Sequence, residues 1–115
     1  MTCCFSECQD ALGVESGAIS DAQMSASSQH SALFAVIHGR LHFKKYNGAW
    51  APSPIDANPW LQIDLGNQVT KVTGVATQGR HSYNQWVTSF KLQYSDDGVN
   101  FHYYGDQPDY APKVK

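Results

Sequence analysis

Histidines and neighbouring carboxylates are the side chains of this sequence best suited to chemistry. The five histidines lie at positions 30, 38, 42, 81 and 102. His38 and His42 are four residues apart, a spacing that puts two metal ligands on one face only in a helix. Gly39 and the strand-like residues around it disfavour a helix. We therefore predict ordinary loop histidines and no metal site.

The motifs of enzyme active sites are missing from the chain. There is no Gly-x-Ser-x-Gly elbow, no glycine-rich phosphate loop and no His-Glu-x-x-His. Asp96-Asp97 precedes Gly98 between two alternating stretches, where aspartate supplies acceptors and glycine supplies the positive φ of a hairpin turn. Asp64 has no second positioned group for acid–base work, and its expected role is to cap a loop or to pair with an arginine. The sequence predicts no catalytic residue and no enzyme.

Three cysteines stand close together at the N-terminus, at Cys3, Cys4 and Cys8, and none follows. The Cys-Cys-x3-Cys spacing does not fit a zinc site. An odd number of cysteines in a secreted-type sequence leaves at least one thiol without a partner in the same chain. We therefore predict that these cysteines form intermolecular disulfides under oxidising conditions, which would make the protein a homo-oligomer.

Length and composition limit the classes of protein. A chain of 115 residues makes one small domain, and 42% apolar residues with only 16% charged ones are typical of a β-rich, secreted-type domain. The net charge of −2 provides no field for nucleic acid. The opening MTCCFSEC lacks the basic start and apolar middle of a signal peptide, and no apolar run is long enough to span a bilayer.

Apolar residues that alternate with polar ones predict strands. The first expected strand covers 22–28, the next covers 60–65, and the Val- and Thr-rich stretch 69–78 suits a third. Residues 29–59 contain Pro52, Pro54 and Pro59 and no sustained period, so we expect long ordered loops there. No helix of ten residues fits anywhere. The elements predict an all-β, antiparallel sandwich or barrel.

The clearest pattern is a hairpin in WVTSFKLQYSDDGVNF, residues 86–101. Asp97-Gly98 separates one alternating stretch from a second that begins at Val99. The side chains on one parity of the first stretch should face the core of the sandwich; they are Trp86, Phe90, Leu92 and Tyr94.

Several segments together resemble one family. LGVESGAISDAQMSASS, GAW, WLQIDLG, VTGVATQGR and the hairpin are similar, in order and spacing, to successive blocks of the discoidin domain, also called the coagulation factor 5/8 type C domain. The resemblance implies a jelly-roll β-sandwich of the galactose-binding-domain-like type. It also implies an extracellular, secreted binding module. We expect residues 1–7 to be a cysteine-containing extension and residues 8–115 to form a single domain.

The resemblance places ligand binding in loops at one end of the sandwich. It assigns the apolar pair Leu33 and Phe34 to one binding loop. The main hypothesis is adhesion to a glycan or protein of the cell surface or matrix. The alternative is docking of the apolar pair on an anionic, phosphatidylserine-containing membrane. The second loop is polar and suits hydrogen bonding and stacking; its residues are Arg80, His81, Tyr83 and Asn84.

The resemblance also implies features that this sequence does not contain. Family members continue with further strands and a closing cysteine that pairs with the position of Cys8, so we expect a C-terminally incomplete domain that lacks the last family strands and tends to associate. Some relatives hold structural calcium. No calcium-loop motif is present here, and we expect no cofactor.

Overall fold

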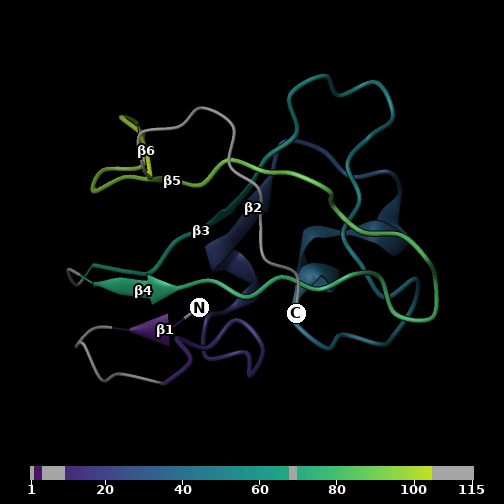
Figure 1. The fold of residues 1–115 in the computed structure, drawn as a ribbon, viewed down its shortest axis with the longest axis horizontal. Helices are drawn as coiled ribbons and strands as arrows, with labels where there is room; N and C mark the ends of the chain where they lie inside the picture. The colour runs from purple at the N-terminus through teal and green to yellow at the C-terminus, as the bar shows by residue number, and fades with distance from the viewer. Residues whose placement is uncertain (1, 4–9, 68–69, 105–115) are drawn as a thin grey trace.

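The computed structural model describes residues 2–3, 10–67 and 70–104. Within them the chain forms short strands that pair two by two in antiparallel fashion: β1 with β4, β2 with β3, and β5 with β6 (Figure 1). The strands are β1 (Thr2–Cys3), β2 (Met24–Ala26), β3 (Leu61–Ile63), β4 (Val72–Gly74), β5 (Gln93–Tyr94) and β6 (His102–Tyr103). Three short 3-10 helices are interspersed, η1 (Asp21–Gln23), η2 (Ala32–Phe34) and η3 (Val36–Gly39).

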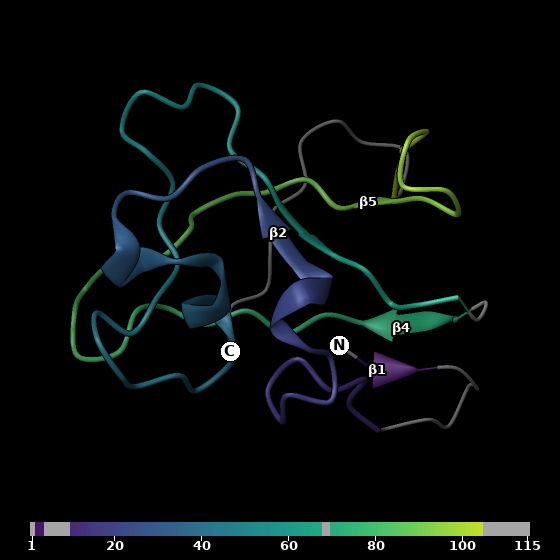
Figure 2. The same ribbon diagram turned by 180° about the vertical axis from the view of Figure 1, so that it is seen from behind.

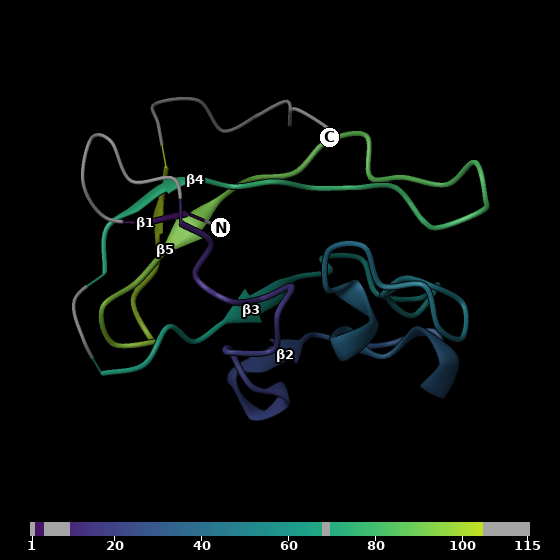
Figure 3. The ribbon, with the colours of Figure 1, turned by 90° about the horizontal axis from the view of Figure 1, so that it is seen from below.

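The strands lie in two layers. Figure 3 shows β2 and β3 in one layer and β1, β4 and β5 in the other, with long loops at one end of both. The all-β, antiparallel sandwich that the sequence predicts is therefore confirmed. Two residues of the expected N-terminal extension, Thr2 and Cys3, pair with β4 in this arrangement. Among the described residues, no helix has the length and apolar character needed to cross a bilayer.

The β2–β3 pair joins two of the stretches that the sequence predicts as strands. Met24 lies opposite Ile63 in the register and is buried. The amide of Gln23 extends the pairing, because its Nε2 donates to the Asp64 carbonyl at 2.8 Å while the Asp64 N–H donates to the Gln23 carbonyl. The strand predicted at 60–65 is confirmed by β3, which is shorter.

The beginning of the strand predicted at 22–28 was wrong. Residues 21–23 form η1, because the Ser20 N–H donates to Gln23 Oε1 at 3.0 Å and the Gln23 N–H donates back to the Ser20 carbonyl at 3.0 Å. This reciprocal pair caps a helical turn. The extended conformation begins only at Met24.

The turn before η1 is held from two sides. The Gly13 carbonyl accepts from the N–H groups of Gly17 and Ile19 at 3.1 and 3.0 Å. Arg40, which follows η3, donates from Nη1 to the carbonyls of Val14 and Ile19 at 2.6 and 2.8 Å. Ile19 is buried beneath this arrangement. The arginine thus fixes a distant turn onto the core.

The long segment 29–59 is ordered by polar contacts, as the sequence predicts for loops. Asp56 accepts from the hydroxyls of Ser27 and Ser28, each at 2.6 Å. The Ser27 and Ser28 hydrogen bonds lower the pKa of the Asp56 carboxyl. The Trp50 indole N–H donates to the Ser28 carbonyl at 2.9 Å. These contacts join the end of β2 to the loops that follow it.

The hairpin is present but shorter than predicted, since its strands cover only Gln93–Tyr94 and His102–Tyr103, and its outward and inward faces also differ from the prediction. Phe90 and Leu92 are half-buried, whereas Trp86 and Tyr94 are each 59% exposed, so the prediction that all four face the core was wrong for these two. For Tyr94 the reason is that β5 and β6 form a separate two-stranded sheet, in which Tyr94 packs against its cross-strand neighbour His102, with the ring centroids 5.7 Å apart.

The Asp-Gly turn of the hairpin is confirmed in detail. Gly98 has a φ of 73°, and Asp97 Oδ1 accepts from the N–H groups of Val99 and Asn100 at 2.8 Å each. These hydrogen bonds, with that of the Ser95 hydroxyl, hold the pKa of Asp97 far below its ordinary value of 3.8. Asp97 is thus a structural acceptor in a turn.

We predict a stability effect of Asp97 that disappears in acid. A carboxylate whose pKa is lower in the folded chain stabilises the fold above its unfolded-state pKa, and this contribution is lost as the pH falls through the folded-state value. The thermal midpoint of Asp97→Ala should therefore lie below that of the wild type at pH 6, with the gap narrowing below about pH 4. The control is Asp96→Ala. A gap that stays constant in acid would contradict the prediction.

Candidate functional site

Two loops that lie far apart in the sequence meet at one end of the sandwich. Residues 30–34 and 79–85 both lie at the end where the long loops gather, seen from opposite sides in Figures 1 and 2. The contact is made by Arg80, whose guanidinium carbon lies 5.1 Å from the centre of the Phe34 ring. The sequence predicted both loops as binding loops, and the structure brings them together.

Four side chains in contact form a group that we call the aromatic–arginine cluster: His30, Phe34, Arg80 and Tyr83. The His30 and Phe34 rings meet edge to face at 5.4 Å. The Arg80 guanidinium lies over the Tyr83 ring at 3.6 Å as well as over Phe34. Guanidinium groups are attracted to aromatic faces by the ring quadrupole. The cluster therefore joins the two loops through one cation.

The polar hydrogens of Arg80 are directed at neutral oxygens. Its Nε donates to the Asn47 carbonyl at 2.7 Å, and its Nη1 donates to Gln85 Oε1 at 2.8 Å. Its own backbone N–H donates to the Gln85 carbonyl at 2.8 Å. Within the described part of the chain, no carboxylate pairs with Arg80. The charge is therefore held in place without being neutralised.

The tip of the second loop is exposed and tightly turned. Ser82 has a φ of 64°, and the Tyr83 N–H approaches the Arg80 carbonyl at 3.4 Å. His81, Tyr83 and Asn84 are exposed, with Tyr83 at 58%. A Cβ on Gly48, which has a φ of 68°, would lie 3.1 Å from His81 Cβ, so the 46–48 turn packs closely beneath the tip.

The apolar pair of the first loop is divided between solvent and the cluster. Leu33 is 49% exposed, whereas Phe34 is half-buried under Arg80 and against His30. Of the six binding residues predicted from the sequence, four are exposed, namely Leu33, His81, Tyr83 and Asn84. Phe34 and Arg80 lie beneath them.

His38 supports the first loop, and the sequence did not indicate this role. The ring is buried and stacks on Phe43 and Tyr46 at centroid distances of 5.0 Å each. Its Nδ1 lies 2.9 Å from the Leu33 carbonyl, which makes Nδ1–H the donor. The available signal was a histidine within the apolar run ALFAVIHG, a pattern more typical of a core residue.

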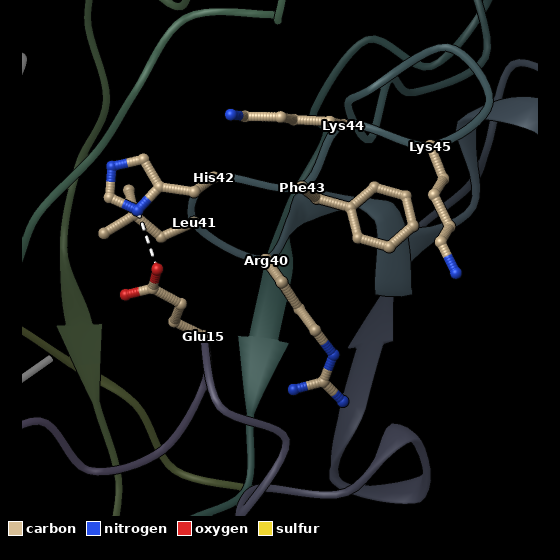
Figure 4. A pocket seen from close by; sticks show the side chains of 7 residues that line it. All are labelled: Glu15, Arg40, Leu41, His42, Phe43, Lys44 and Lys45. Carbon is tan, nitrogen blue, oxygen red and sulfur yellow. Dashed lines mark hydrogen bonds and ion pairs between the residues drawn. The ribbon is translucent and has the colours of Figure 1, made fainter.

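A groove of about 390 Å³ lies next to this region and has a basic lining (Figure 4). Two of its ionisable side chains have acidic partners: His42 Nδ1 lies 2.7 Å from Glu15 Oε2, and Arg40 Nη2 lies 2.8 Å from Asp21 Oδ1. Figure 4 shows the Lys44 and Lys45 side chains extending in different directions. The groups are arranged as structural ion pairs and solvated lysines. The lining residues are Glu15, Arg40, Leu41, His42, Phe43, Lys44 and Lys45.

The sequence predicts no metal site, and the cysteine chemistry that it predicts concerns the N-terminal segment. Within residues 2–3, 10–67 and 70–104, no three His, Cys, Asp or Glu side chains gather as a metal ion would require. Cys4 and Cys8 lie outside the described residues. The intermolecular disulfides of Cys3, Cys4 and Cys8 therefore stay a prediction.

An antiparallel sandwich that presents exposed loop residues at one end is the architecture of a binding module. The F5/8 type C domain model matches residues 23–114, which is most of the chain. The chain belongs to the F5/8 type C, or discoidin, domain family, as the sequence blocks predicted.

Curated relatives support the same assignment. Lactadherin of Sus scrofa is 40% identical over 103 residues, 84% of this chain and 25% of its own length. The EGF-like repeat and discoidin I-like domain-containing protein 3 of Homo sapiens is 39% identical over 105 residues, 85% of this chain and 22% of its own length. Coagulation factor VIII of Canis lupus familiaris is 40% identical over 104 residues, 86% of this chain and 4% of its own length. The chain spans a quarter or less of these relatives.

Proposed function

We propose that the chain is an extracellular recognition module that binds a neutral, ring-bearing surface, either a glycan or an exposed face of a protein. The ligand is held by the exposed tips of the two loops, with Tyr83 as the main stacking side chain and His81 and Asn84 as hydrogen-bonding partners. Leu33 adds apolar contact from the other loop. Membership of the discoidin family supports a binding role, and the secreted relatives support the extracellular location.

The engagement of Arg80 is the observation that carries this proposal. An arginine recognises carboxylate, sulfate or phosphate by presenting two parallel N–H groups. One edge of the guanidinium uses Nε, which already donates to Asn47, and the other uses Nη1, which already donates to Gln85. Two of its five N–H groups are thus already engaged within the chain, and its faces lie against Phe34 and Tyr83, which reduces what it can offer an anion. The Tyr83 side chain, which is 58% exposed, is available without any displacement.

Exposure of Leu33 favours a second candidate, a peripheral module for anionic phospholipid. Complete burial of one leucine in lipid contributes about 1.5–3 kcal/mol. Phe34, which would double this contribution, is half-buried in the cluster. Stable attachment to a membrane needs two signals. We therefore place membrane docking second.

The proposal predicts that Tyr83→Ala weakens ligand binding about tenfold, since truncation of a central aromatic costs roughly 1–2 kcal/mol. The probes are an immobilised panel of neutral oligosaccharides and vesicles of phosphatidylcholine with or without phosphatidylserine. Tyr94→Ala is the matched control, because Tyr94 is 59% exposed but lies in β5.

Saturable, sugar-displaceable binding that Tyr83→Ala reduces and Tyr94→Ala preserves would support a glycan ligand. Binding only to vesicles with phosphatidylserine, lost in Leu33→Ala, would replace the proposal with the second candidate.

A further inference from the structure

Three loops meet at Arg80. Its guanidinium lies over Phe34 of loop 30–34, its Nε donates to the Asn47 carbonyl in loop 46–51, and its Nη1 donates to Gln85 of its own loop, 79–85. The first two loops are also joined directly, because the Ala51 N–H donates to the Phe34 carbonyl at 3.3 Å and the His30 N–H donates to the Ala51 carbonyl at 2.7 Å. Arg80 adds the third loop to this pair.

We propose that Arg80 is a positioning residue that fixes the three loops as one rigid surface and does not itself contact the ligand. This inference rests on the proposed function, because it assigns a supporting role to one of the six side chains predicted to bind. It also divides the site: Leu33, His81, Tyr83 and Asn84 form the outer surface, and Arg80 with Phe34 forms the layer beneath.

The chemistry of the cluster requires arginine at this position. A planar guanidinium can lie flat over aromatic rings while its edges donate to two acceptors in different directions. In the structure the guanidinium carbon lies 3.6 and 5.1 Å from two ring centres while Nε and Nη1 donate hydrogen bonds at 2.7 and 2.8 Å. A lysine ammonium is a compact charge on a flexible stem. It would keep the charge and lose the fixed geometry.

The strained turn at the loop tip needs support from neighbouring residues, and Arg80 provides it. Ser82 is held at a φ of 64°, a region that non-glycine residues adopt at a free-energy cost. Such a conformation persists only where the surroundings determine it. Arg80 precedes the turn and Gln85 follows it, and the two are joined by a backbone and a side-chain hydrogen bond. The same residue that connects the loops therefore also closes the turn.

The test is hydrogen exchange and NMR of the unliganded chain, comparing wild type with Arg80→Lys and Arg80→Gln. We expect exchange at the amides of Phe34, Gly48 and Tyr83 to rise together by about tenfold in both variants, the scale of losing one hydrogen bond from a charged donor. The ring protons of Phe34 and Tyr83 should shift in both variants. Amides of the β2–β3 pair should keep their wild-type exchange.

Lys44→Gln is the matched control, because it removes an exposed positive charge from a neighbouring loop without touching the cluster. Exchange that rises only within 79–85, or an Arg80→Lys variant that behaves like the wild type, would overturn the inference. A general rise that includes the β2–β3 amides would also overturn it, since Arg80 would then be an ordinary stability residue. No ligand is used, so this result is independent of the Tyr83→Ala binding test.

Discussion

The Arg40→Leu variant should lose about 3 kcal/mol of unfolding free energy, because it leaves two backbone carbonyls in a part-buried setting without their donor. Arg40 donates to Val14 and Ile19 from one nitrogen and to Asp21 from another, and its side chain is only 11% exposed. The lost carbonyl partners belong to the turn that covers Ile19. The measurement is urea unfolding followed by tryptophan fluorescence.

The Asp21→Asn variant distinguishes the contribution of the Arg40–Asp21 ion pair to the unfolding free energy from that of the carbonyl contacts. Asp21 is 68% exposed at 2.8 Å from the guanidinium. Exposed ion pairs contribute about 0–1 kcal/mol, so Asp21→Asn should remain close to the wild type. If the two variants lost the same free energy, the ion pair would be the stabilising contact and our account of Arg40 would be wrong.

The second large effect is expected at Gly13. Its φ is 116°, and a Cβ built there would lie 2.5 Å from the Ala18 Cβ, well inside any real contact. Gly13→Ala therefore combines unfavourable backbone strain with a clash that the 13–19 turn can relieve only by opening. We expect a loss of about 2–3 kcal/mol by the same urea measurement.

Gly17→Ala is the control for the clash. Gly17 also has a positive φ, 89°, but a Cβ added there would meet nothing within 4 Å. It should lose only the strain contribution, about 1 kcal/mol. Equal losses at both positions would show that strain alone accounts for the Gly13 effect.

The sequence was most informative where a local rule decides the structure. Asp97 and Gly98 specify the hairpin turn by acceptor placement and positive φ, and both behave as predicted. Alternation at 60–65 likewise identified β3. Asp64 caps a loop as expected, because its Oδ1 accepts from the Gly66 N–H at 2.8 Å.

The remainder depends on contacts between distant segments, which a local pattern does not contain. Alternation placed Trp86 and Tyr94 on the core side, but which face is covered depends on how the β5–β6 pair sits, and both side chains are exposed. The stack of Arg80 on Phe34 and the hydrogen bond from His38 to Leu33 join loops through tertiary packing. Loop identity was therefore predictable, whereas the division into outer and supporting residues was not.

The carbonyl that accepts from Arg80 belongs to Asn47, and the next residue is Gly48. In an Asn-Gly pair the glycine nitrogen can attack the carbonyl carbon of the asparagine side chain and release ammonia, which closes a succinimide ring. Water then opens the ring to aspartate or to isoaspartate, which has one extra methylene in the main chain. The folded chain holds the Gly48 N–H against the Lys45 carbonyl at 2.9 Å, which slows this attack. Where it does occur, the main chain runs through the side-chain carbons of residue 47, and the carbonyl that accepts from Arg80 becomes a free carboxylate. Chemical ageing of the protein would thus change the contact between these loops at the very atom that Arg80 binds.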